Sequence, residues 1–76
     1  MKQIFDFYVK CINPDGSYFL KKDKIYGGRY EDDRIYSGNI WLIHYSESIT
    51  RKSNIKFEYI GTYTQYIDYI LKETEF

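Results

Sequence analysis

The sequence predicts a mainly β fold that ends in one helix, in the order β-β-β-β-α. Several short segments alternate apolar and polar residues with a period of two, which is typical of strands with one buried face. The last segment of the chain changes to the i, i+3, i+4 spacing of an amphipathic helix. We therefore expect a curved antiparallel sheet, or a partly open barrel, whose open side the helix covers.

A length of 76 residues allows a single domain, with the sheet over residues 4–60 and the helix over residues 62–74. A domain of this size buries only about 60% of the surface that its unfolded chain exposes, so its core needs large side chains. Ten tyrosines, five phenylalanines and one tryptophan can supply them. Because ten tyrosines exceed what such a core can hold, we expect several of them at the surface.

The first predicted strand, residues 4–12, has the most regular alternation. One face would carry Phe5, Phe7, Val9 and Cys11, and the other face Asp6, Tyr8 and Lys10. In the turn that follows, "NPDGS" at 13–17, Pro14 pre-sets φ and Gly16 supplies a positive φ. Leu20 is the expected apolar anchor of the loop after this turn.

Three further strands are predicted. Residues 24–31 contain Gly27-Gly28, and paired glycines inside a strand predict a bulge or a sharp bend. Residues 32–39 then turn the chain. The segment "IWLIHY" at 40–45 is apolar on both faces, which predicts a central strand, and residues 55–60 alternate again.

The helical spacing at the end of the chain defines an apolar stripe that should pack against the sheet. Thr62 is the expected N-cap, with Gln65 reaching back to it as in a capping box. Tyr69 lies off the stripe and should be exposed. The stripe consists of Tyr63, Tyr66, Ile67, Ile70 and Leu71.

Residues 9–26, "VKCINPDGSYFLKKDKIY", carry a pattern of strand, glycine-containing loop and second strand. Its marker positions are Cys11, Gly16, Leu20, Lys24 and Tyr26. In this pattern the chain resembles small SH3-like barrel proteins of Firmicutes and their phages. The resemblance implies an SH3-like fold and no particular activity, because a fold does not determine function. A helix replaces the short turn and closing strand usual in that family, so barrel closure is in question.

The charge and cysteine content argue against several classes of protein. Eleven basic residues balance eleven acidic ones, whereas general nucleic-acid binding and membrane-surface binding rest on clustered Lys and Arg. The start "MKQIFDFYVKCI" has no long apolar run, so neither a signal peptide nor a membrane span is expected. One cysteine cannot form an internal disulfide, which favours a reducing cytoplasm.

The residue types needed for catalysis or metal binding are few. Cys11 and His44 are the only cysteine and histidine, and Cys11 falls on the apolar face of its strand. One Cys and one His leave a zinc site two ligands short. Glu31-Asp32-Asp33 lacks the spacing of a calcium loop, and Gly27-Gly28 lacks the residues of a phosphate loop. We therefore expect no enzyme activity, no cofactor and no metal.

The segment 30–36 is the most informative candidate site. It is either a plain hairpin end, with Asp32-Asp33 in the turn, or a protein-contact patch, because Tyr and Arg are enriched at binding hot spots. The candidate contact residues are Tyr30, Glu31, Asp32, Asp33, Arg34 and Tyr36.

Three functions remain open from the sequence. The first is a non-enzymatic protein-binding module, by analogy a phage product that inhibits a host enzyme or defence system, as anti-CRISPR proteins do. The second is a small nucleic-acid-binding module, disfavoured by the neutral charge, with a stacking platform of Tyr8, Tyr18, Tyr30 and Tyr36. The third is an oligomeric nucleotide-sequestering protein that holds phosphates with Arg29, Arg34, Arg51 or Lys52.

Overall fold

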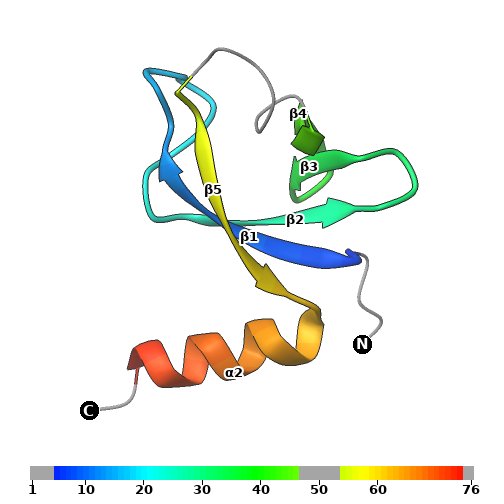
Figure 1. Ribbon diagram of the computed structural model, residues 1–76, viewed down its shortest axis with the longest axis vertical. Helices are drawn as coiled ribbons and strands as arrows, with labels where there is room; N and C mark the ends of the chain where they lie inside the picture. The colour runs from blue at the N-terminus through cyan, green and yellow to red at the C-terminus, as the bar shows by residue number, and fades with distance from the viewer. Residues whose placement is uncertain (1–4, 47–53, 75–76) are drawn as a thin grey trace.

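The computed structural model describes residues 5–46 and 54–74, which form one open antiparallel sheet followed by a helix (Figure 1). The strand order is β4-β3-β2-β1-β5, so β4 and β5 are the edges of the sheet. The predicted mainly β fold with a C-terminal helix is confirmed. The elements are β1 (Phe7–Asn13), β2 (Ile25–Arg29), β3 (Arg34–Ser37), β4 (Ile40–His44), β5 (Lys56–Gly61) and α2 (Tyr63–Thr74).

One face of the sheet carries the hydrophobic core. The alternation of β1 places Phe7, Val9 and Cys11 there, and Leu20 anchors the loop between β1 and β2, as predicted. Because β1 lies between β2 and β5, its odd-numbered side chains lie between those of the two neighbouring strands on the core face. The buried cluster consists of Phe7, Val9, Cys11, Leu20, Tyr26, Ile35, Ile43 and Ile55.

The helix packs on the opposite face of the sheet from the core, and Figure 1 shows it on the other side of the β1–β5 pair from β3 and β4. The ring of Tyr8 stacks on the ring of Tyr66, with centroids 4.3 Å apart and planes 11° from parallel. Lys10 donates a hydrogen bond of 3.1 Å to the hydroxyl of Tyr69. The helix therefore covers one face of the sheet, as predicted. It covers the face of β1 that we expected to be polar.

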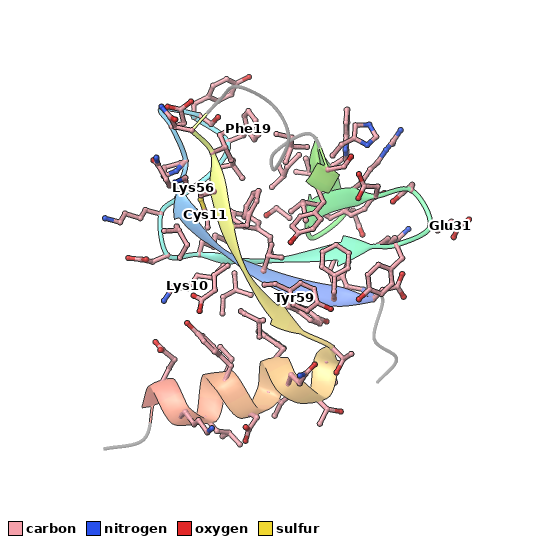
Figure 2. All side chains as sticks on the ribbon, viewed as in Figure 1. Lys10, Cys11, Phe19, Glu31, Lys56 and Tyr59 are labelled. Atoms are coloured by element: carbon pink, nitrogen blue, oxygen red, sulfur yellow. The ribbon has the colours of Figure 1, made fainter. Side chains whose placement is uncertain are left out.

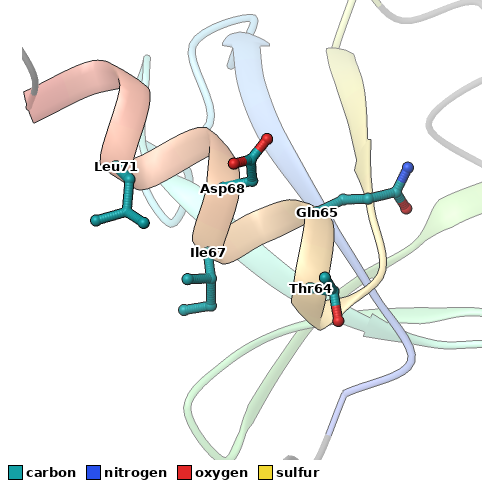
Figure 3. A pocket seen from close by; sticks show the side chains of 5 residues that line it. All are labelled: Thr64, Gln65, Ile67, Asp68 and Leu71. Atoms are coloured by element: carbon teal, nitrogen blue, oxygen red, sulfur yellow. The ribbon is translucent and has the colours of Figure 1, made fainter.

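The helix also presents a different stripe from the predicted one. Tyr66, Tyr69 and Ile70 are partly buried, so the prediction of an exposed Tyr69 is wrong. Ile67 and Leu71, which lie on the same side of α2 (Figure 3), are 38% and 60% exposed, although the spacing placed them in the buried stripe. The reason is that Tyr66 and Tyr69 of α2 contact Tyr8 and Lys10 of β1, so the helix turns its tyrosine side toward the sheet. At the start of α2, Gln65 reaches back as predicted, and its Oε1 accepts the backbone N–H of Thr62 at 2.9 Å. The Thr62 hydroxyl donates to the same oxygen at 3.3 Å.

Residues 32–39 contain a strand that the sequence interpretation missed. β3 lies between the turn at 30–33 and a two-residue turn at Gly38-Asn39, where Gly38 has φ of 62°. The extra hairpin moves β4 to the edge of the sheet, so the prediction of a central strand at 40–45 is wrong. Ile43 faces the core, whereas Ile40 and Trp41 are 68% and 46% exposed.

The two glycines of β2 are paired in register with β1 and with β3, so the predicted bulge is wrong. Their role is to make room for aromatic rings. A Cβ atom at Gly28 would collide with the ring of Phe7 on the core face, and one at Gly27 with the ring of Phe5 on the other face. The alternation predicted that Phe5 shares the face of Phe7. This is wrong, because Phe5 precedes β1 and its ring lies on the opposite face.

We expect Gly28→Ala to destabilise the fold more than Gly27→Ala. The ring of Phe7 is 2% exposed and packs against three tyrosine rings, so it cannot move away from a new methyl group, whereas Phe5 is only partly buried. Overpacking of this kind costs about 1–3 kcal/mol. Urea unfolding of both variants measures the difference, and equal losses would contradict the assigned role of Phe7.

A second pair of variants tests how α2 docks. Tyr66→Ala removes the stacked ring on Tyr8 and should lower the free energy of unfolding by about 1–3 kcal/mol. Leu71→Ala removes a mostly exposed side chain and should change it by no more than about 0.5 kcal/mol. Thermal unfolding followed by circular dichroism compares them. A larger loss of unfolding free energy for Leu71→Ala than for Tyr66→Ala would show that α2 docks through the stripe predicted from the sequence.

Candidate binding site

The turn between β2 and β3 is held by its own acidic residues. The carboxylate of Asp32 accepts the hydroxyl of Tyr36 at 2.5 Å and the backbone N–H of Arg34 at 3.2 Å. Asp33 has a positive φ of 56°, and its carboxylate accepts the backbone N–H of Ser46 at 2.9 Å. These two carboxylates therefore stabilise the hairpin end and tie it to the residues after β4.

The hydrogen bond between Tyr36 and Asp32 shifts the pKa of both groups in opposite directions. It is the main cause that lowers the pKa of the Asp32 carboxyl, with the N–H and the charge of Arg34 acting in the same direction. The same bond raises the pKa of the Tyr36 hydroxyl. Asp32 is consequently a carboxylate at neutral pH, and each of its oxygens accepts one hydrogen bond within the turn.

Glu31 differs from its two acidic neighbours. It is exposed at the tip of the hairpin, and Figure 2 shows it at the outer end of the β2–β3 connection. Of the three consecutive acids, Glu31 alone is exposed, since Asp32 and Asp33 are half-buried.

The strand register places two cross-strand rows on the face of the sheet opposite the core. Arg29 of β2 lies opposite Arg34 of β3, and Arg34 lies opposite His44 of β4. The adjacent row runs from Gly27 through Tyr36 to Trp41. The row of two arginines and a histidine thus lies beside the row that carries the rings of Tyr36 and Trp41.

Both arginines lie over aromatic rings of that second row. The Cζ atom of Arg34 is 4.6 Å from the ring centroid of Trp41, and that of Arg29 is 4.9 Å from the centroid of Tyr36 and 6.0 Å from that of Phe5. These distances are those of cation–π interactions. We call this surface the arginine–aromatic face, defined by Phe5, Arg29, Arg34, Tyr36 and Trp41.

The guanidinium groups of this face have no acidic partner within residues 5–46 and 54–74. The ion pair found there joins Lys72 and Asp68 on α2. The Nε atoms of Arg29 and Arg34 are buried and make no hydrogen bond. Because buried polar atoms are usually paired, two unpaired Nε atoms on neighbouring arginines call for an explanation.

The six candidate contact residues at 30–36 divide between two faces of the sheet. Arg34 and Tyr36 belong to the arginine–aromatic face. Tyr30 stacks on Phe7 with centroids 4.9 Å apart, and its phenol oxygen lies 2.8 Å from that of Tyr59, on the core side. The hairpin tip between them is formed by Glu31, Asp32 and Asp33.

The structure adds Phe5 and Trp41 to the site, and the sequence interpretation assigned neither to a binding surface. A signal for Trp41 was present in "YSGNIW", where glycine at the first position of a two-residue turn is typical of a tight hairpin. Recognising that hairpin would have placed Tyr36 opposite Trp41. Phe5 carried no such signal, because its position depends on the packing space over Gly27.

The other candidate residues are more scattered. The tyrosines of the proposed stacking platform do not share one surface: Tyr8 is buried against α2, Tyr18 is 96% exposed in the loop after β1, and Tyr30 and Tyr36 lie on opposite faces. Of the candidate phosphate ligands, Arg29 lies on the arginine–aromatic face, while Arg51 and Lys52 lie outside the described residues.

Cys11 and His44 lie on opposite faces of the sheet. Burial raises the pKa of the Cys11 thiol, which disfavours the thiolate needed for nucleophilic attack. His44 lies in β4 beside Trp41, with ring centroids 5.4 Å apart. Across the described segments, His, Cys, Asp and Glu side chains do not gather in a group of three that could hold a metal ion.

A comparison of the chain with protein families, curated proteins and solved structures finds no match. Within the described part of the chain, α2 is too short and too polar to span a membrane.

The link between Tyr36 and Asp32 predicts a pH effect. Because the folded-state pKa of Asp32 is lowered, its contribution to stability is present above its ordinary pKa of about 3.9 and is lost as the pH falls through the lowered value. Tyr36→Phe should raise the pKa of Asp32 toward its ordinary value and reduce the loss of stability that occurs as the pH falls below about 4.

A ¹³C NMR titration of the Asp32 carboxyl measures this pKa directly. Tyr18→Phe is the matched control, because Tyr18 is exposed in another loop, and it should leave the titration of Asp32 unchanged. The assigned hydrogen bond is absent in solution if Asp32 titrates alike in wild type and Tyr36→Phe.

Proposed function

We propose that this protein is a non-enzymatic protein-binding module, and that its contact surface is the arginine–aromatic face with the adjacent hairpin tip. One observation carries the proposal: Arg29 and Arg34 are held over aromatic rings while their guanidinium groups have no acidic partner in the described residues. Trp, Tyr and Arg are the residue types that dominate binding hot spots. Here all three lie together on one face of the sheet.

The charge pattern favours a protein partner over a nucleic acid. Glu31, Asp32 and Asp33 lie at the end of the same hairpin whose strands carry Arg29 and Arg34. A negative tip beside two positive side chains complements a protein surface of mixed charge and would repel a continuous phosphate backbone. The balance of eleven basic and eleven acidic residues supports the same choice, because general nucleic-acid affinity rests on an excess of basic groups.

The identity of the partner is proposed by analogy. The resemblance of residues 9–26 to small SH3-like barrel proteins of Firmicutes and their phages suggests a phage-encoded inhibitor of a host enzyme or defence system, as anti-CRISPR proteins are. Such an inhibitor would act in the cytoplasm, where a lone buried cysteine such as Cys11 remains reduced.

Nucleotide sequestration is the second candidate. Guanidinium groups over aromatic rings also suit a ligand with a phosphate and a planar base, so Arg29, Arg34, Tyr36 and Trp41 support it. The acidic tip counts against nucleotide binding, because a carboxylate near Arg34 would repel a phosphate. The charge of Arg34 helps to lower the pKa of Asp32, which places the two groups close together.

Affinity capture from a Gram-positive host lysate, with and without phage infection, tests the protein-binding proposal. The tagged protein should recover a stoichiometric partner. Trp41→Ala should weaken that complex by about 30-fold, as expected for a hot-spot residue. Glu31→Lys should weaken it less. Asp33 is left unchanged because it holds the turn.

Lys56→Gln is the matched control. Lys56 is exposed on β5, and Figure 2 shows it far from Glu31. This variant should bind the partner as the wild type does, and circular dichroism should show the same fold for all three variants. The proposal fails if the wild type recovers no partner in either lysate, or if Trp41→Ala and Lys56→Gln bind equally well.

A further inference from the structure

We propose that Arg29 and Arg34 together bind one oxyanion group, and that the protein partner supplies it as a carboxylate of an acidic segment. This inference rests on the protein-binding function proposed above and names the chemistry of the partner.

The first argument is the direct opposition of two like charges. Arg29 and Arg34 are cross-strand partners in β2 and β3. The Cβ atoms of such partners lie about 4.5–5.5 Å apart, and like charges in this position are destabilising. A sequence that keeps such a pair breaks a local rule of sheet stability, and such exceptions are typical of functional sites. An anion bound between the two groups would remove the repulsion.

The second argument is the direction in which the two side chains lean. Each arginine lies over the diagonal neighbour on the next strand, Arg29 over Tyr36 and Arg34 over Trp41. Both side chains therefore lean toward the same cross-strand row. Their Nε atoms are buried in this packing, so the terminal N–H groups are the donors that remain for a ligand. Such N–H groups match the two oxygens of a carboxylate or the oxygens of a phosphate.

The third argument is that the nearest acids are already engaged. The two carboxylate oxygens of Asp32 accept the Tyr36 hydroxyl and the Arg34 backbone N–H, and Asp33 accepts the Ser46 backbone N–H. Neither carboxylate forms an ion pair with a guanidinium within the described segments. The charge of Arg34 acts on Asp32, but no carboxylate of these segments forms an ion pair with either guanidinium, so their terminal N–H groups are left for an external group.

The adjacent surfaces favour an acidic protein segment as the source of that group. Trp41, on the edge strand, is 46% exposed and offers apolar area beside the arginines. A peptide can place one carboxylate on the arginine pair and apolar side chains on this area. A nucleic acid would bring further phosphates toward the acidic tip at Glu31.

Arginine-detected ¹⁵N NMR on the folded protein tests the inference. The Nε–H signals of Arg29 and Arg34 should shift in a saturable way when hexaglutamate is added, and more weakly with sodium acetate, against sodium chloride at equal ionic strength. Arg29→Gln and Arg34→Gln should each weaken hexaglutamate binding by about tenfold or more, as expected for charge-assisted hydrogen bonds. Lys56→Gln should leave it unchanged.

Two results would overturn the inference. One is the absence of saturable shifts with both hexaglutamate and acetate in the wild type, which needs no variant to fold. The other is binding of a ten-residue oligothymidylate or of inorganic phosphate that hexaglutamate does not displace, since the site would then be a phosphate site. Either result leaves the protein-binding proposal standing if the wild type recovers a partner and Trp41→Ala weakens that complex. If the wild type captures no partner but binds hexaglutamate, the protein-binding proposal fails while the anion-binding site at Arg29 and Arg34 stands.

Discussion

The packing of the Phe7 ring over Gly28 is the interaction on which the rest of the structure depends. It brings β2 against β1 on the core side, and the same ring packs against Tyr30, Tyr45 and Tyr59. Because Gly28 then faces the core and side chains alternate along a strand, Arg29 lies on the opposite face, where the pairing of β2 with β3 places it across from Arg34. The same strand pairing thus fixes both the core on one face of the sheet and the arginine–aromatic face on the other.

The sequence predicted those features that depend on local pattern. The alternation of β1, the buried Leu20 and the capping of α2 by Gln65 all follow from residues close together in the chain. Features decided by distant residues were missed. Gly27-Gly28 looked like a bulge because nothing local shows that rings of Phe5 and Phe7 occupy the space above them.

The candidate site was found in part, for the same reason. Arg34 and Tyr36 were named from their residue types, but Tyr30 was grouped with them although it lies on the other face. Trp41 was missed because β3 was taken for part of a turn, which hid the pairing of Tyr36 with Trp41. The acidic run drew attention as a charge cluster, whereas Asp32 and Asp33 serve mainly to close the hairpin.

The position of α2 has a consequence for how the molecule opens. Since α2 packs on the face away from the core, through Tyr8 and Lys10 of β1, it can detach without exposing the cluster around Phe7 and Val9. Local openings of this kind have lower free energies than global unfolding. The backbone amides of α2 should therefore exchange with solvent deuterium through a separate opening of lower free energy. Those of β1 and β2 should exchange only when the whole sheet unfolds.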